Sequence, residues 1–308
     1  MIDRVQEQLT TRLGSTRRDA LKKLGLGVAG LAGLNLITGK AEAQATGSLE
    51  QDAAILNFAL NLEYLEAQYY LYATTGQGLP AQGVSIEGSG EKGFVTIKPT
   101  PKVPFETQII RQYAQEIAAD ELDHVKFIRA VLEAGGFQPV AQPKIDLLNS
   151  FNTLAIAAGI GPSFDPFENE VNFLIGAFIF EDVGVTAYKG AAPLLFNKNV
   201  LEAAAGILAV EAYHASEVRT NLSRFDEARP TAGIAGIVQK ISDLRDALDS
   251  PANKDQGIKR DGKANIVPTN KFGLAFSRNT REVLNIVYGA QGASSGLFFP
   301  NGVNGSIQ

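Results

Sequence analysis

The sequence contains only two histidines, and each lies three residues after a glutamate. The pairs are Glu121 with His124 and Glu211 with His214. On an α-helix, residues three apart lie about 60° apart around the axis, so both side chains of a pair project from one face and can share a metal ion. A buried histidine of this kind is often only a packed core residue. Because the same context occurs twice, the pattern favours metal binding.

Both glutamates lie in the middle of apolar helix faces. At helical spacing Glu121 is surrounded by Ala114, Ile117, Ala118, Val125 and Ile128, and Glu211 by Ala204, Ile207, Leu208, Ala215 and Val218. An ionised carboxylate on a buried face is costly unless it is paired or bound to a cation. The two motifs are therefore expected to face the interior and to meet a positive charge there.

Two further glutamates lie on apolar faces, and each has a tyrosine seven residues later. They are Glu63, followed by Tyr70, and Glu181, followed by Tyr188. Glu66 also has apolar neighbours, so it competes with Glu63 as the ligand from its helix, or both contribute. The tyrosines are expected to pack in the core, to hydrogen-bond a ligand carboxylate or to take a redox role.

The resulting inventory is four carboxylates and two imidazoles around one site. Four carboxylates offset the charge of two divalent cations, and the donor set suits Fe or Mn, with Zn remaining open. Asp120, directly before Glu121, is a candidate to hydrogen-bond a ligating histidine, whereas the other motif has Val210 at that position. The sequence assigns no catalytic residue.

The elements that must position these residues are long helices. Apolar residues recur at helical spacing over four segments, which predict helices at about 49–73, 105–132, 166–191 and 199–225. Glu106 is expected in the first turn of the second helix, and Gly135 with Gly136 ends it. The connection 137–165, with a short helix at 150–158, is long enough to cross over the bundle. The expected fold is all-α, a four-helix bundle with a crossover connection.

The segments outside these helices are less regular. Residues 75–104 are rich in Gly and Pro, and the β-like runs 84–86 and 94–97 predict a hairpin inserted between the first two helices. The glycines Gly176, Gly184 and Gly206 are expected to allow close helix packing.

The C-terminal part is expected to add one more helix and an irregular tail. A fifth helix is predicted at 233–248 and a short one at 280–288. The apolar segment 297–300 is expected to pack on the bundle or on a neighbouring subunit of a homo-oligomer. The predicted division is a leader at 1–45, a bundle at 46–230 and a C-terminal region at 231–308.

The first 45 residues are typical of an export signal. Arg17 and Arg18 form a twin-arginine pair, followed by an apolar run at 24–37 and small residues at 41–45. We expect cleavage after Ala43 or Ala45 and a periplasmic or extracellular mature protein without a membrane span. Twin-arginine signals commonly export proteins that have already folded around a cofactor.

Composition excludes several classes of function. The formal charge is −5 and the pI is about 5.3, so no basic surface for nucleic acid is expected and cations are the favoured small partners. There is no cysteine, which excludes disulfides, thiolate metal sites and cysteine nucleophiles.

Four segments resemble a known family: 60–67, 118–124, 176–184 and 206–214. From about residue 49 to the C-terminus the chain is similar to the ferritin-like family that includes the desiccation-related proteins of plants and their exported bacterial relatives. The resemblance implies a ferritin-like four-helix bundle and a metal site. It implies no particular reaction.

The expected function is redox chemistry of a di-metal centre with dioxygen or peroxide, such as oxidation of Fe(II) or removal of peroxide during drying. Disproportionation of peroxide, as in a manganese catalase, is the enzymatic alternative. The other alternative is a desiccation protectant or structural protein whose metal ions only stabilise the bundle.

Overall fold

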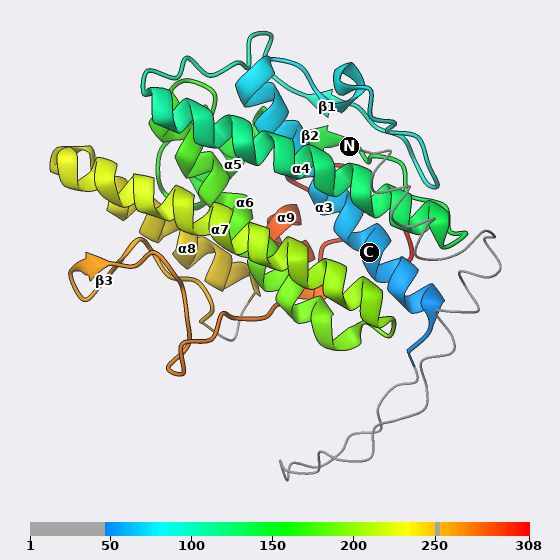
Figure 1. The fold of residues 1–308 in the computed structure, drawn as a ribbon. Helices are drawn as coiled ribbons and strands as arrows, with labels where there is room; N and C mark the ends of the chain where they lie inside the picture. The colour runs from blue at the N-terminus through cyan, green and yellow to red at the C-terminus, as the bar shows by residue number, and fades with distance from the viewer. Residues whose placement is uncertain (1–46, 250–252) are drawn as a thin grey trace.

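The computed structural model describes residues 47–249 and 253–308. The export-signal prediction, including Arg17 and Arg18, lies outside these residues. Four long helices form the central bundle (Figure 1): α3 (Leu49–Thr75), α4 (Gln108–Ala134), α6 (Glu170–Ala191) and α7 (Lys198–Ala228). Their positions confirm the four helices predicted from periodicity.

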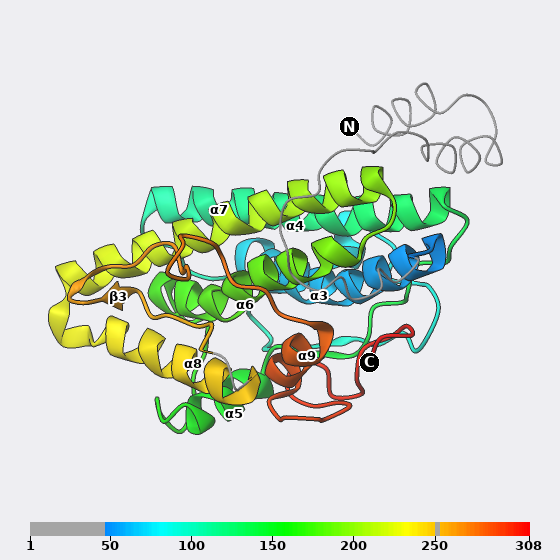
Figure 2. The ribbon, with the colours of Figure 1, turned by 90° about the horizontal axis from the view of Figure 1, so that it is seen from below.

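The bundle consists of two helix pairs joined by a long connection. α3 packs along α4, and α6 packs along α7. The connection between the pairs contains α5 (Asn149–Ala157), which confirms the predicted crossover. Figure 2 shows α4 and α7 on one face, α3 and α6 in the middle, and α5, α8 (Ile234–Asp249) and α9 (Thr280–Tyr288) on the other side.

Short polar side chains fix where the helices begin. Ser48, Asn169 and Asn197 cap the N-termini of α3, α6 and α7 by accepting hydrogen bonds from the first free backbone N–H groups. α4 begins after Thr107, so Glu106 precedes the helix. The prediction that Glu106 lies in the first turn was wrong. Glu170 explains this start, because its carboxylate accepts hydrogen bonds from the backbone N–H groups of Glu106 and Thr107.

The insertion between α3 and α4 does not form the predicted hairpin. It contains a short 3-10 helix, Leu79–Gln82, and strand β1 (Val95–Thr96), which pairs in parallel with β2 (Ile145–Asp146) of the crossover. A Cβ atom on Gly93 would collide with the backbone of Lys144, so this glycine permits the close approach. The hairpin prediction was wrong because the true partner strand lies about 50 residues further along the chain, beyond the reach of local pattern.

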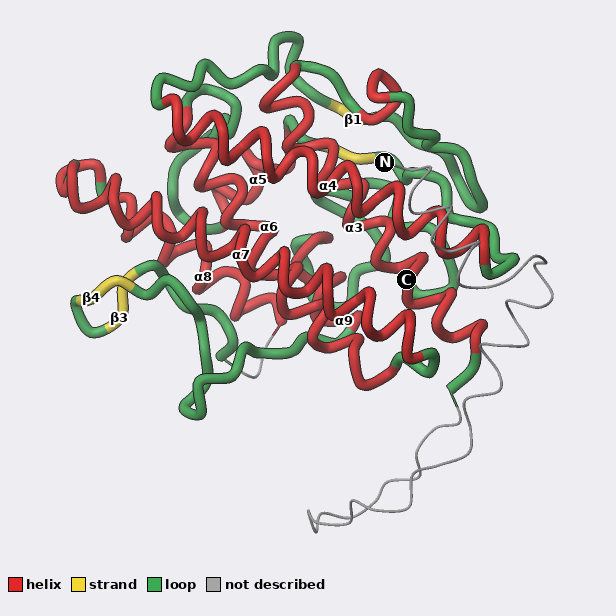
Figure 3. Tube along the Cα trace, in the orientation of Figure 1, coloured by secondary structure: helices red, strands yellow, loops and turns green. Residues whose placement is uncertain are grey.

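The C-terminal region wraps around α6 and α7. After a 3-10 turn (Pro230–Ala232) it contains α8, the small hairpin β3 (Lys259–Arg260) with β4 (Lys263–Ala264), and α9, all joined by long loops (Figure 3). Another 3-10 turn, Ala192–Leu194, joins α6 to α7. Phe298 and Phe299 are buried, and the ring of Phe298 lies 4.9 Å from that of Phe180. Of the two alternatives for the segment 297–300, it therefore packs on its own bundle.

Within the described residues, one helix has the length and composition of a membrane span. It covers Glu170–Leu194, and 72% of its most apolar window is buried inside the fold. This segment is α6 with the turn that follows it, and it lies in the middle layer of the bundle (Figure 2). Its apolar character thus corresponds to burial against the neighbouring helices.

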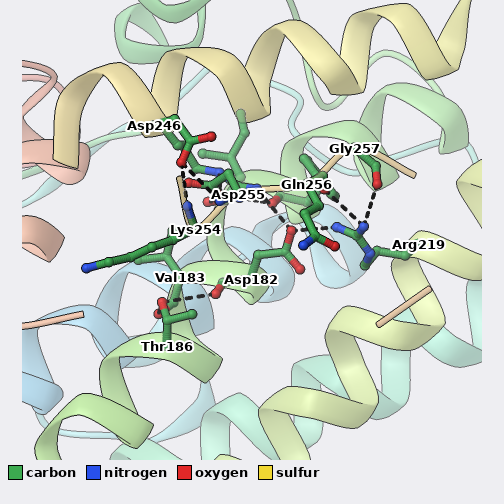
Figure 4. A network of polar contacts seen from close by, with 12 residues as sticks. Asp182, Val183, Thr186, Arg219, Asp246, Lys254, Asp255, Gln256 and Gly257 are labelled. Carbon is green, nitrogen blue, oxygen red and sulfur yellow. Dashed lines mark hydrogen bonds and ion pairs between the residues drawn. The ribbon is translucent and has the colours of Figure 1, made fainter. Parts of the chain in front are cut away.

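A buried network of arginines and aspartates joins α6 to the C-terminal region (Figure 4). Asp182 accepts hydrogen bonds from Arg219 of α7 at 2.8 Å and from Arg245 of α8 at 3.0 Å. Arg245 also pairs with Asp255, which in turn pairs with Arg278. All five side chains are at most 5% exposed. Each buried charge has a partner of the opposite sign, as burial requires.

We predict that Asp182→Asn destabilises the fold by about 3–5 kcal/mol, because two buried guanidinium groups lose their shared counter-ion. Urea unfolding followed by circular dichroism measures the effect. Asp123→Asn is the matched control: Asp123 pairs with Lys126 on the surface, where such a pair contributes about 0–1 kcal/mol. Equal effects of the two substitutions would show that the network adds no more than a surface pair.

Candidate metal centre

The bundle brings all six predicted ligand residues together in its interior. Glu63 comes from α3, Glu121 and His124 from α4, Glu181 from α6, and Glu211 and His214 from α7. Their exposed fractions range from 0% to 8%. The i, i+3 spacing puts each histidine on the same face as its glutamate, and the apolar residues around them turn that face inward.

The six side chains form two groups that share Glu121. In the first, single atoms of Glu63, Glu121, His124 and Glu211 all lie within 4.8 Å of one another, and in the second so do atoms of Glu121, Glu181 and His214. His124 Nδ1 lies 3.2 Å from Glu63 Oε2, and His214 Nδ1 lies 3.1 Å from Glu121 Oε1. Atoms that bind one ion at about 2.1 Å lie about 3 Å apart, so both groups have the spacing of a coordination shell.

Two tyrosines hold two of the carboxylates across the bundle. Tyr70 of α3 donates to Oε1 of Glu181 on α6, and Tyr188 of α6 donates to Oε1 of Glu63 on α3. Each tyrosine therefore donates a hydrogen bond to the glutamate of the other helix. One oxygen of each carboxylate is occupied, and the other, Oε2, is left to face the site.

Two other acidic residues lie next to the six. Asp120 Oδ2 is 3.1 Å from Nε2 of His214, so this aspartate contacts the histidine of the opposite helix. Glu66 is 5% exposed, and its charge interacts with those of Glu63, Glu121 and Glu181. Glu66 belongs to neither of the two groups, whereas Glu63 belongs to the first.

Burial and mutual repulsion govern the protonation of this cluster in the absence of a metal. Burial and the charges of neighbouring glutamates raise the pKa of Glu211 well above its ordinary value. Burial would also raise the pKa of Glu121, but the adjacent imidazoles of His124 and His214 lower it to about 2. Burial would lower the pKa of His124, but Glu63 and Glu121 raise it to about 12. The carboxylates thus draw positive charge into the site, and the protonated imidazoles supply it.

The pattern of unsatisfied atoms fits a pair of divalent cations. Six fully buried atoms of these residues make no aligned hydrogen bond: Glu63 Oε2, Glu121 Oε1, Glu181 Oε2, both carboxylate oxygens of Glu211, and His214 Nδ1. An unpaired buried carboxylate oxygen is costly, and a native fold keeps one only where something else binds it. These six are half of the twelve unpaired buried side-chain atoms among the described residues, and they come from the two groups that could hold a metal ion.

Gly184 has a role that the sequence pattern did not reveal. A Cβ atom there would collide with Oε2 of Glu211, so the glycine leaves room for a carboxylate as well as for a helix. Gly206, in contrast, faces open space, so the expectation that it permits close packing was wrong. A glycine three residues after Glu181 was the available signal, because it lies on the same face as that glutamate.

We predict that Gly184→Ala displaces the Glu211 carboxylate, lowers the metal bound per chain and destabilises the fold by about 1–3 kcal/mol through overpacking. Gly206→Ala is the control, and it is expected to raise stability by about 0.5–1 kcal/mol without changing the metal content. Elemental analysis and thermal melting measure the two quantities. A Gly184→Ala protein with unchanged metal content would contradict the role assigned to this glycine.

Comparison with known proteins agrees with this architecture. Residues 51–224, which include all four bundle helices up to near the end of α7, match the ferritin-like domain family. No solved structure gives a significant match to the chain.

Two curated relatives match over most of their length. The desiccation-related protein PCC13-62 of Craterostigma plantagineum is 31% identical over 83% of this chain and 84% of its own. The ferritin-like catalase Nec2 of Nesocodon mauritianus is 26% identical over 84% of this chain and 85% of its own. This chain belongs to the ferritin-like domain family, as the family match, the coverage of the relatives and the four-helix bundle show.

Proposed function

We propose that this protein is an exported di-metal protein that carries Fe or Mn and reacts with peroxide or dioxygen. The observation that carries the proposal is the set of six buried ligand atoms without hydrogen-bond partners, which converge from four helices. Carboxylate and imidazole ligands without thiolate suit Fe and Mn. Zn would fit the same ligands but has no redox chemistry.

In the proposed site Glu63, Glu121, His124 and Glu211 would hold one ion, and Glu121, Glu181 and His214 would hold the other. The bound ions would supply the one- and two-electron redox chemistry that the side chains lack. The charges balance, because four carboxylates offset two divalent cations. Glu66 is a further acidic residue beside the ions, available as an additional ligand or as a group that holds a proton.

The protein residues contribute position, orientation and exclusion of water. Tyr70 and Tyr188 fix the carboxylates of Glu181 and Glu63 from outside. Asp120 orients the ring of His214 through Nε2, so that Nδ1 faces the ions. The ligands are nearly inaccessible to solvent, which favours a substrate as small as peroxide or dioxygen.

Disproportionation of peroxide is the version of this chemistry that a relative supports, because one of them is named a ferritin-like catalase. One peroxide is oxidised to dioxygen and another is reduced to two waters, so no external reductant is needed. Oxidation of Fe(II), the ferroxidase-like version, uses the same ligands. Arg17 and Arg18 support export by the twin-arginine route, and the desiccation-related relative supports a role in protection from oxidative stress during drying.

The desiccation-related relative also favours a second candidate function, in which the ions only stabilise a protective bundle. Ligand binding to the folded state alone stabilises it by about 2.7 kcal/mol when the free ligand is at 100 times its Kd. On this alternative, chelation lowers the melting temperature although the loaded protein has no redox activity.

We predict that the full chain reconstituted with Mn or Fe consumes peroxide and releases one dioxygen for every two peroxides. An oxygen electrode and absorbance of peroxide measure the two rates. Oxidation of added Fe(II) without release of dioxygen would identify the ferroxidase-like version. If metal-loaded protein neither consumes peroxide or dioxygen nor oxidises Fe(II), the redox proposal is refuted, and chelation with thermal melting then tests the stabilising role.

We also predict that His124→Ala and His214→Ala each weaken metal binding at least 10- to 100-fold, the range found even for residues that only support a ligand. The metal content should fall from two ions per chain towards one, because each histidine serves a different ion. Elemental analysis after dialysis gives the count. Asp123→Asn, an exposed position within the first motif, should retain both ions. Full metal content in both histidine variants would refute the assigned ligands.

A further inference from the structure

α4 and α7 lie next to each other on the face of the bundle opposite α5, α8 and α9 (Figures 1 and 2). They run antiparallel, as the colours along the two helices show (Figure 2). No other element of the described residues lies over this face. We call the line between the two helices the α4–α7 seam. Both histidines come from these helices, and at 8% and 5% exposure they are the most exposed of the six candidate ligand residues.

The two helices carry the same ligand motif but differ in the residues around it. When Glu121–His124 is aligned with Glu211–His214, Asp120 corresponds to Val210, Glu116 to Gly206, Phe127 to Glu217 and Val131 to Asn221. Because the helices are antiparallel, the acidic residues Glu116, Asp120 and Glu217 lie at one end of the seam, together with Asn221. The apolar members of these pairs meet at the other end. The pseudo-symmetry of the site is thus broken in charge.

The acidic end consists of Glu116, Asp120 and Glu217, which we call the seam acids. Glu116 is exposed, the side chain of Asp120 is 43% exposed, and Glu217 is partly buried. Glu217 accepts a hydrogen bond from the side chain of Asn221, and its other oxygen, Oε2, is buried without a partner. The carboxylates therefore form a graded series from the surface towards the interior.

The series ends at the second ligand group. Glu181 and His214 are 1% and 5% exposed, and Glu181 Oε2 and His214 Nδ1 have no hydrogen-bond partner. Glu217 lies three residues after His214 on α7, one helical turn away and on the same face. Burial and the negative charges of Glu181 and Glu116 raise the pKa of Glu217 to about 7, against the opposing charge of His214. A region that resists a further negative charge attracts a cation.

At the opposite end, the positions related to Asp120, Glu217 and Asn221 carry no such groups. Phe127, Val131 and Val210 are partly buried there, and none of them carries a charge or a hydrogen-bonding side chain. A hydrated divalent cation would have to lose water against apolar side chains at that end, at high cost. At the acidic end, carboxylates can replace the lost water one after another.

We infer that the seam acids form the path by which divalent metal cations reach the centre, with Glu217 as the last carboxylate before Glu181 and His214. This inference rests on the proposed function, since it concerns the same metal centre. It assigns Glu116 and Glu217 to the rate of metal loading and not to the final coordination shell. Asp120 has both roles, because it also contacts His214.

The test is the rate of Mn²⁺ uptake by the metal-free full chain, with samples quenched by chelator at set times, desalted and analysed for bound metal. The variant is Glu116→Gln with Glu217→Gln, which removes both charges and leaves an acceptor oxygen for Asn221. Asp120 stays unchanged. Glu202→Gln is the matched control, because Glu202 is exposed and lies on α7, near the start of that helix. Circular dichroism verifies that each variant is folded.

We expect the rate of Mn²⁺ uptake to fall by on the order of 10-fold in the double variant. This is the lower end of the increase in association rate that a group of like charges gives. The final metal content should equal that of the wild type, and added salt should slow the wild type more than the variant. Glu202→Gln should load at the wild-type rate.

Three outcomes would overturn the inference, and they differ from failure of the proposed function. Wild-type loading in the double variant would mean that metal enters elsewhere. A lower final content would make Glu217 part of the coordination shell, and equal slowing by Glu202→Gln would reduce the effect to net charge. If the wild type itself binds no Mn²⁺ or Fe²⁺, the proposed function fails first.

Discussion

The interior of this bundle contains four carboxylates and two imidazoles, and the two imidazoles cannot balance the charge of all four carboxylates. Ionised groups are stable inside a protein only when charge and hydrogen bonds are balanced locally. Here the tyrosines and Asp120 satisfy the outer atoms, while the inner atoms of Glu63, Glu181, Glu211 and His214 stay unpaired. The long helices, the glycine beside Glu211 and the apolar layers around the site all serve to hold this imbalance in one place.

The Arg–Asp network on the other side of α6 also buries carboxylates, but there arginines of the protein balance their charge. Asp182 is the residue after Glu181, yet its buried charge is balanced by Arg219 and Arg245. Asp249 and Asp255 lie with Asp246 in another acidic group of metal-binding dimensions, but Arg278 pairs with both. Protein cations already fill that group. The contrast separates a structural charge network from a cluster that could hold metal ions.

The two halves of the bundle are alike where they hold ligands and unlike where they meet solvent. Glu63 with Tyr70 and Glu181 with Tyr188 exchange hydrogen bonds symmetrically. Asp120 and Glu217 have no acidic counterparts, since Val210 and Phe127 occupy the related positions. Two similar ions would need similar ligands from both halves, whereas a path by which cations enter needs acidic residues at one end only. Additional acids at both ends would add repulsion without a partner to offset it.

The sequence by itself determined the four helices and which six residues meet in the candidate site. Helical period and carboxylates on apolar faces are local signals, and two histidines in a whole chain leave few alternatives. The tertiary structure alone decided which atoms meet: that Tyr70 serves Glu181, that Asp120 contacts the histidine of the other helix, that Gly184 makes room for Glu211, and that β1 pairs with β2. These contacts join residues 27 to 111 positions apart, and the packing of elements, which no local pattern encodes, brings them together.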